Sequence, residues 1–226
     1  MFTPYDWQEA MGHRAQFVES KLALGTPVVA LSIKPGILLF TFRRQARKLF
    51  EIYDRLALGA IGLQSDVEAI RLAAVDFAHQ VGYAHSEEDV TLHRVMAAIS
   101  VPVKQAFANF TSAPFVAQSL FAEVCENPES DCFAVLEYDG DFRTCDRLSV
   151  AAADNEVKRN LQKKIGGLKS FDMDVKEATK ALEEIWKEVI PATIGDTDGV
   201  GEPSLEIALM ERKPKGESRF KFVTNE

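Results

Sequence analysis

The chain has 226 residues, of which 46% are hydrophobic, and this is enough to close one sizeable core and predicts a single domain spanning residues 1–226. Its formal net charge of -8 argues against general affinity for nucleic acid or for an anionic membrane surface, because both need a positive protein surface. Three cysteines without paired spacing predict reduced thiols, and with neither a signal-peptide pattern nor a membrane-length apolar run we expect a cytoplasmic protein.

The N-terminal region predicts a helix over residues 6–24. Asp6 and Glu9 have the spacing of a capping box, in which each side chain accepts from backbone amides of the first turn. Apolar residues, including Trp7, Met11 and Phe17, then recur at three- and four-residue intervals. This apolar stripe must cover either the body of the domain or a neighbouring molecule.

Four short apolar runs follow and predict buried strands. Residues 27–33 and 37–42 are joined by Lys34-Pro35-Gly36, which is typical of a hairpin. Residues 50–53 and 56–61 repeat the pattern. Because the first two runs are almost continuously apolar, we expect both of their faces to be covered.

A pair of helices is expected next. Ser65 to Glu68 fit a second capping box, and the helix that follows should end at Gly82. Another helix covers residues 90–109, where Pro102 removes an amide donor and should kink or divide it.

The remaining chain repeats the order of strands and helices. Residues 114–125, 132–138 and 142–148 are expected to form strands, residues 154–165 and 172–189 helices, and residues 204–212 and 219–223 strands. Sequential groups of strands and helices fit an α+β fold, a four-layer αββα sandwich of two antiparallel sheets flanked by helices. Some other α+β sandwich is the alternative.

Two features of the sequence could carry function. Thr26 follows Gly25 at the start of the first expected strand, but residues 20–50 contain no acid to support a nucleophile. Arg43, Arg44, Arg47 and Lys48 place four cations within six residues, a pattern that captures carboxylates or acidic tails. A solvated turn is the plainer interpretation of that cluster.

Other catalytic and binding signatures are absent from the sequence. The four histidines form no metal-ligand pattern, and there is no nucleophile elbow and no glycine-rich phosphate loop. We therefore expect no catalytic residue, no cofactor and no metal ion in this chain.

Several segments together resemble proteasome core-particle subunits, specifically the α-type subunits of bacterial proteasomes. The segments that carry this resemblance are Gln8-Glu9-Ala10-Met11, Val28-Val29-Ala30-Leu31, the run from Lys48 through Ile52-Tyr53-Asp54-Arg55 to Gly62, Gly82-Tyr83-Ala84, Asp89-Val90-Thr91, Ala122-Glu123-Val124, Tyr138-Asp139-Gly140 and Ser204-Leu205-Glu206-Ile207-Ala208.

The resemblance implies the N-terminal-nucleophile hydrolase fold, in which residues 26–226 form the αββα core and residues 6–24 an extra helix found only in α-type subunits. It implies partners as well: identical α-subunits in a seven-membered ring, a proteasome β-subunit and a regulatory AAA ATPase. By analogy, the terminal residues form a gate over the axial pore (Met1, Phe2, Thr3, Pro4 and Tyr5).

In the same resemblance, Lys48 corresponds to the α-subunit lysine that receives the C-terminal carboxylate of the ATPase, and Arg47 supports the local potential. Trp7, Met11 and Phe17 are candidates for packing between ring neighbours. The chain would then be a non-catalytic, gating subunit. The alternative is a catalytic β-like or ancestral proteasome peptidase with Thr26 as nucleophile, although residues 43–47 are too few to resemble the lysine-bearing loop of active subunits.

Overall fold

The computed structural model describes residues 4–190, 203–213 and 217–223. Within them the strands form two five-stranded antiparallel sheets. The first sheet has the order β10-β9-β2-β1-β8, and the second has the order β3-β4-β5-β6-β7. The strands of the first sheet are β1 (Val28–Ile33), β2 (Gly36–Arg43), β8 (Leu148–Ala151), β9 (Ser204–Glu211) and β10 (Phe220–Phe222); those of the second are β3 (Leu49–Tyr53), β4 (Leu56–Gly62), β5 (Ala117–Glu123), β6 (Cys132–Leu136) and β7 (Phe142–Asp146).

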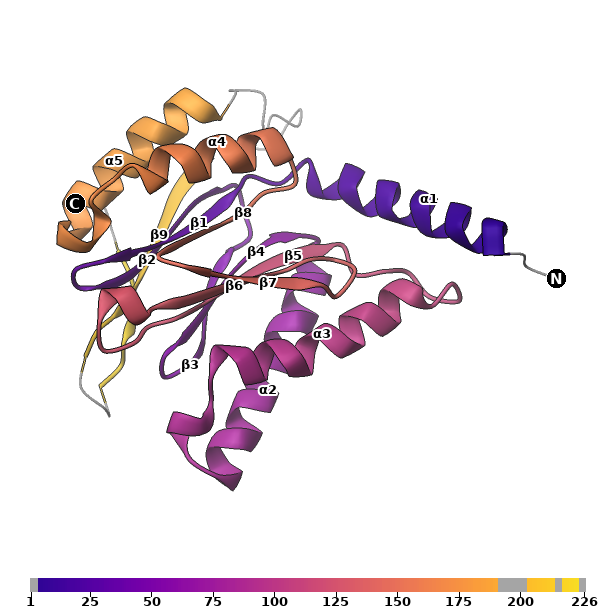
Figure 1. The fold of residues 1–226 in the computed structure, drawn as a ribbon, viewed down its shortest axis with the longest axis horizontal. Helices are drawn as coiled ribbons and strands as arrows, with labels where there is room; N and C mark the ends of the chain where they lie inside the picture. Colours follow the sequence, from indigo (N-terminus) through magenta and orange to yellow (C-terminus); the bar gives the residue numbers. More distant parts are fainter. Residues whose placement is uncertain (1–3, 191–202, 214–216, 224–226) are drawn as a thin grey trace.

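Helix pairs cover the outer faces of both sheets (Figure 1). The helices α4 (Asn155–Gly166) and α5 (Val175–Val189) pack on the first sheet, where Trp186 contacts Phe40. The helices α2 (Gln64–Ala84) and α3 (Leu92–Ala108) pack on the second sheet, and a separate apolar cluster fills the space between the sheets. The expected αββα sandwich is confirmed.

The hairpin of β1 and β2 agrees closely with its prediction. Both strands are buried almost throughout, and β2 lies between β1 and β9. Gly36 has a φ of 154°, and a Cβ atom there would lie 2.0 Å from the carbonyl oxygen of Met210. Only glycine fits this close approach of β2 to β9.

The helix α1 (Pro4–Leu22) extends away from the sandwich, and its N-terminal end is far from both sheets (Figure 1). Val18 and Leu22 near its C-terminal end are buried, and they anchor it to the core between the sheets. The predicted cap at Asp6 is wrong, because the helix already begins at Pro4. Proline is well tolerated in the first turn of a helix, where its missing N–H has no intrahelical partner.

The helix α2 differs from its prediction at both ends. Leu63 precedes the first turn, and the carboxylate of Asp66 accepts from the amide of Val116 at 2.8 Å instead of capping the helix. Gly82 does not end the helix. A Cβ atom at this position would lie 2.2 Å from the hydroxyl oxygen of Tyr53, so glycine here permits close packing of α2 against β3.

The predictions for α3 and α5, the second helix of each pair, also differ from the structure. Pro102 does not divide α3, which continues from Leu92 to Ala108. The helix α5 begins at Val175 after a capping box formed by Asp174 and Glu177, rather than at residue 172. Short 3-10 helices cover Glu87–Asp89, Pro128–Ser130 and Ser170–Asp172.

The predicted strand over residues 142–148 is wrong, because the chain changes sheets within it. The strand β7 ends at Asp146 in the second sheet, and β8 begins at Leu148 in the first. Arg147 between them has a φ of 70°, in the left-handed region that ordinary residues rarely adopt. Its guanidinium donates to the carbonyl of Leu168, which ties this crossing to the loop after α4.

None of the described helices is both long and apolar enough to cross a lipid bilayer.

Candidate functional site: the Thr26–Lys48 cluster

Thr26 lies two residues before the start of β1 and is 9% exposed. The chain is continuous from α1 through Gly25, so the backbone nitrogen of Thr26 is part of a peptide bond. The hydroxyl of Thr26 donates to the carbonyl of Phe42 at the end of β2. The side chain is therefore held between the first two strands.

Lys48 directs its amine at Thr26. The residue lies directly before β3, and its half-buried side chain places Nζ 2.6 Å from the carbonyl oxygen of Thr26 and 2.5 Å from its Oγ1. The short segment between β2 and β3 thus brings a lysine to the threonine hydroxyl. Residues 43–47 were expected to be too few to resemble the lysine-bearing loop of active subunits, and the contact between Lys48 and Thr26 was not predicted.

A carboxylate completes the cluster from a distant part of the chain. Glu206 of β9 accepts from the backbone amide of Lys48 at 3.0 Å and lies 3.8 Å from Nε of Arg43. The register of β2 with β9 sets Glu206 opposite Thr41. We define the Thr26–Lys48 cluster as Thr26, Lys48, Glu206 and Arg43.

Burial dominates the electrostatics of the cluster. It lowers the pKa of Lys48 to about 7, although the negative charge of Glu206 acts in the opposite direction. Burial also raises the pKa of Glu206, against the backbone amide of Lys48 and the charges of Arg43 and Arg47. Lys48 therefore changes charge near neutral pH. Its neutral amine can accept a proton, and its charged form can bind a carboxylate.

The cationic run does not form one uniform surface. Arg47 is exposed, and its guanidinium stacks on the ring of Phe222 with 4.4 Å between its carbon and the ring centroid. Arg43 donates to the carbonyl of Gln45 at 2.9 Å and interacts with Glu206. Arg47 thus extends the positive potential outward from the more enclosed amine of Lys48.

The expected ring-packing residues lie on α1 and are only partly covered. Trp7 is 50% exposed and meets the ring of Phe110 edge-on, with centroids 6.3 Å apart. Phe17 is 48% exposed, and Met11 is half-buried. Among the expected gate residues, Met1, Phe2 and Thr3 lie outside the described residues, whereas Pro4 and Tyr5 belong to α1 and do not precede it.

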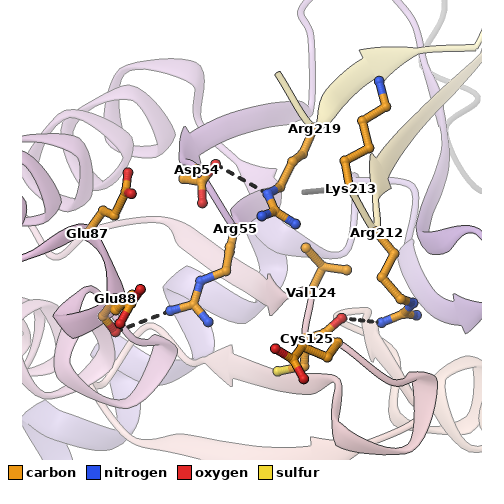
Figure 2. A pocket seen from close by; sticks show the side chains of 10 residues that line it. Asp54, Arg55, Glu87, Glu88, Val124, Cys125, Arg212, Lys213 and Arg219 are labelled. Carbon is orange, nitrogen blue, oxygen red and sulfur yellow. Dashed lines mark hydrogen bonds and ion pairs between the residues drawn. The ribbon is translucent and has the colours of Figure 1, made fainter. Parts of the chain in front are cut away.

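A pocket of about 720 Å³ lies at the β3–β4 turn, at the opposite end of β3 from Lys48 (Figure 2). Its arginines already have partners. Arg219 pairs with Asp54 at 3.2 Å, Arg55 donates to the carbonyl of Glu88 at 3.2 Å, and Arg212 donates to the carbonyl of Cys125 at 2.6 Å. These contacts connect separate parts of the chain, which indicates a structural role for the arginines.

The described residues contain no group of three or more histidine, cysteine, aspartate or glutamate side chains placed to hold a metal ion.

Two antiparallel sheets between helix pairs define an αββα sandwich, with Thr26 just before β1 in contact with Lys48 just before β3. The family model "Proteasome subunit" matches residues 24–200, and the chain belongs to the proteasome subunit family.

Curated relatives further indicate an α-type subunit. The chain is 27% identical to "Proteasome subunit alpha" of Streptomyces scabiei over 99% of its own length and 89% of the relative. It is 28% identical to the protein of the same name from Streptomyces coelicolor, over 99% and 87%. A shorter match, to "Proteasome subunit alpha" of Xylanimonas cellulosilytica, reaches 35% identity over 59% of this chain and 55% of the relative.

Proposed function

We propose that this chain is a non-catalytic α-type subunit that forms the outer ring of a 20S proteasome core, controls access to its pore and docks a regulatory ATPase. The observation that carries the proposal is α1, a helix that precedes Thr26 and is anchored in the core between the sheets by the buried side chains of Val18 and Leu22, as a permanent part of the fold would be. An N-terminal nucleophile needs the free amine that this arrangement removes. Cleavage of substrates then belongs to a separate β-subunit.

The partners follow from this role. Identical α-subunits would complete a seven-membered ring, in which the exposed faces of Trp7 and Phe17, with Met11, pack against a neighbour. A β-subunit would lie beneath the ring, and a regulatory AAA ATPase above it. Burial of half-exposed aromatic side chains is an effective source of interface free energy, which supports α1 as a ring contact.

Docking of the ATPase is assigned to Lys48, with Arg47 supporting the local potential. An incoming C-terminal carboxylate would accept from the Lys48 amine and replace contacts that the amine now makes with Thr26. Arg47 is exposed at the same loop, so its guanidinium can attract the carboxylate before contact.

Gating is assigned to residues 1–5. We expect that deleting these residues from an assembled core raises unstimulated hydrolysis of a short fluorogenic peptide several-fold, because the deletion removes the residues proposed to cover the axial pore together with Pro4 and Tyr5 of the first turn of α1. A peptide too short to need unfolding reports pore access alone. Substituting the exposed Gln16 on the same helix by alanine, with the terminus intact, serves as a control for disturbance of α1. Unchanged basal hydrolysis after the deletion would contradict the gate.

A catalytic function for Thr26 is the second candidate. The contact between its hydroxyl and the Lys48 amine favours it, because an amine with a pKa of about 7 can take a proton from a nucleophile. This function also requires cleavage between Gly25 and Thr26, which would release α1 from the chain.

A further inference from the structure

A second pocket, of about 580 Å³, lies between α4 and the edges of the two sheets. The strands β8 and β7, each at one edge of its own sheet, contribute to its wall together with β6. No residue of the Thr26–Lys48 cluster lines this pocket. Its volume falls within the range of small-molecule sites. We call it the sheet-edge pocket.

The charge of the sheet-edge pocket is predominantly positive. Arg143, Lys158 and Arg159 line it, against one acid, Glu137. Glu137 accepts from the amine of Lys158 at 3.3 Å, so these two charges compensate each other. Two guanidinium groups are left to set the potential inside the pocket.

Both guanidinium groups have donors to spare. The side chain of Arg143 is exposed, and its guanidinium makes no hydrogen bond or ion pair with any residue that the structure describes. Arg159 donates through Nε to the carbonyl of Asn155 at 3.1 Å, while its terminal amino groups have no partner within the described part of the chain. A guanidinium presents its terminal donors in the planar arrangement that matches carboxylate and phosphate oxygens.

A buried hydroxyl in the same wall also lacks a partner. Ser149 of β8 lines the pocket and is 0% exposed, yet its Oγ finds no hydrogen-bond partner among the described residues. Buried hydroxyl groups are normally hydrogen-bonded, since leaving one unpaired costs free energy. Ser149 therefore leaves an unused hydrogen-bond donor in the pocket wall, which a polar ligand atom can satisfy once the side chains that cover it rotate away.

We propose that the sheet-edge pocket binds the oxyanion of a small molecule, either a phosphate or a carboxylate group. Arg143 and Arg159 bind the anion, and the hydroxyl of Ser149 donates to it after the side chains that cover this hydroxyl rotate away. This site goes beyond ring formation, gating and ATPase docking, and it stands on different residues from all three.

Calorimetric titration of the purified full chain tests the proposal, with inorganic phosphate and citrate as probes at constant ionic strength. We expect at least one probe to bind, and Arg143→Ala to weaken that binding about tenfold or more, as expected for loss of a charge-assisted hydrogen bond. Ser149→Ala should weaken it about threefold to tenfold without a change of charge. Binding of phosphate alone identifies a phosphate site, and binding of citrate alone a carboxylate site.

Lys163→Ala is the matched control, because it removes one positive charge from an exposed position of α4 outside the pocket lining. This variant should bind the probe as the parent chain does. Thermal melting checks that each variant is folded. The proposal is overturned if neither anion binds, if Arg143→Ala binds as tightly as the parent chain, or if Lys163→Ala weakens binding equally.

Discussion

Replacing Lys48 by alanine is expected to abolish ATPase-stimulated degradation by the assembled core. Peptide hydrolysis by a core without its gate should remain intact, because the variant changes the docking amine and not the β-subunit. A hydrogen-bonded ion pair to an otherwise enclosed carboxylate commonly contributes a few kcal/mol, and about 3 kcal/mol corresponds to a loss in affinity of roughly 150-fold. The measurement is the rate of degradation of a folded substrate with and without the ATPase.

Lys34→Ala is a matched control for this experiment. Lys34 is exposed at the β1–β2 turn, at the opposite end of β1 from Thr26, so its loss changes the net charge equally without affecting the cluster. Size-exclusion chromatography of both variants shows whether the ring still assembles. Survival of stimulation in an assembled Lys48→Ala core would exclude Lys48 as the docking residue.

Affinity for the ATPase tail is expected to fall as the pH rises above about 7. Only the charged amine of Lys48 can pair with a carboxylate, and burial lowers the pKa of Lys48 to about 7 before docking. The bound carboxylate favours the charged form and raises this pKa, so docking above pH 7 must take up a proton. Below pH 7 the amine is already charged and this cost disappears.

Each pH unit between the free and the bound pKa should weaken the affinity by up to about tenfold. Fluorescence anisotropy with a labelled C-terminal peptide of the ATPase, between pH 6 and pH 9, measures the effect. Arginine keeps its charge throughout this range, so Lys48→Arg should remove most of the pH dependence. Glu206 is the acid of the cluster, and burial raises its pKa, so the same titration on Glu206→Gln checks whether this carboxyl group contributes to the decline. A flat profile for the parent chain would contradict docking on the Lys48 amine.

The layers of the fold could be predicted because their signals are local. The apolar runs of β1 and β2 are nearly continuous, and the structure buries them between α4, α5 and the second sheet. The helix boundaries were less predictable. Asp66 has the spacing of a cap, but its carboxylate binds the amide of Val116, fifty residues away in sequence, and local pattern carries no information about that contact.

The crossing between the sheets was missed for a similar reason. The sequence pattern of β7 and β8 predicts one continuous strand, and it contains no turn signal at Arg147, where the chain passes from one sheet to the other. A positive φ at arginine is stabilised by tertiary contacts, here with Leu168 and Ser170. Glycine or asparagine at this position would have given a recognisable signal.

The candidate site shows the same limit. Thr26 and Lys48 were both identified from the sequence, but their contact was not predicted. Glu206 was not predicted to belong to a functional site. Glu206 is a buried acid between the apolar residues Leu205 and Ile207 of β9, and that exception was the available signal. Its partner could not be deduced, because 158 residues separate it from Lys48.

The intact mass of this chain, isolated from a core assembled with its β-subunit, tests the central claim most directly. A non-catalytic ring subunit should retain residues 1–25 and give a mass near 25.1 kDa, apart from loss of the initiator methionine, with no labelling of Thr26 by an epoxyketone. A chain that begins at Thr26 and carries the epoxyketone on that residue would contradict the proposal that this subunit is non-catalytic.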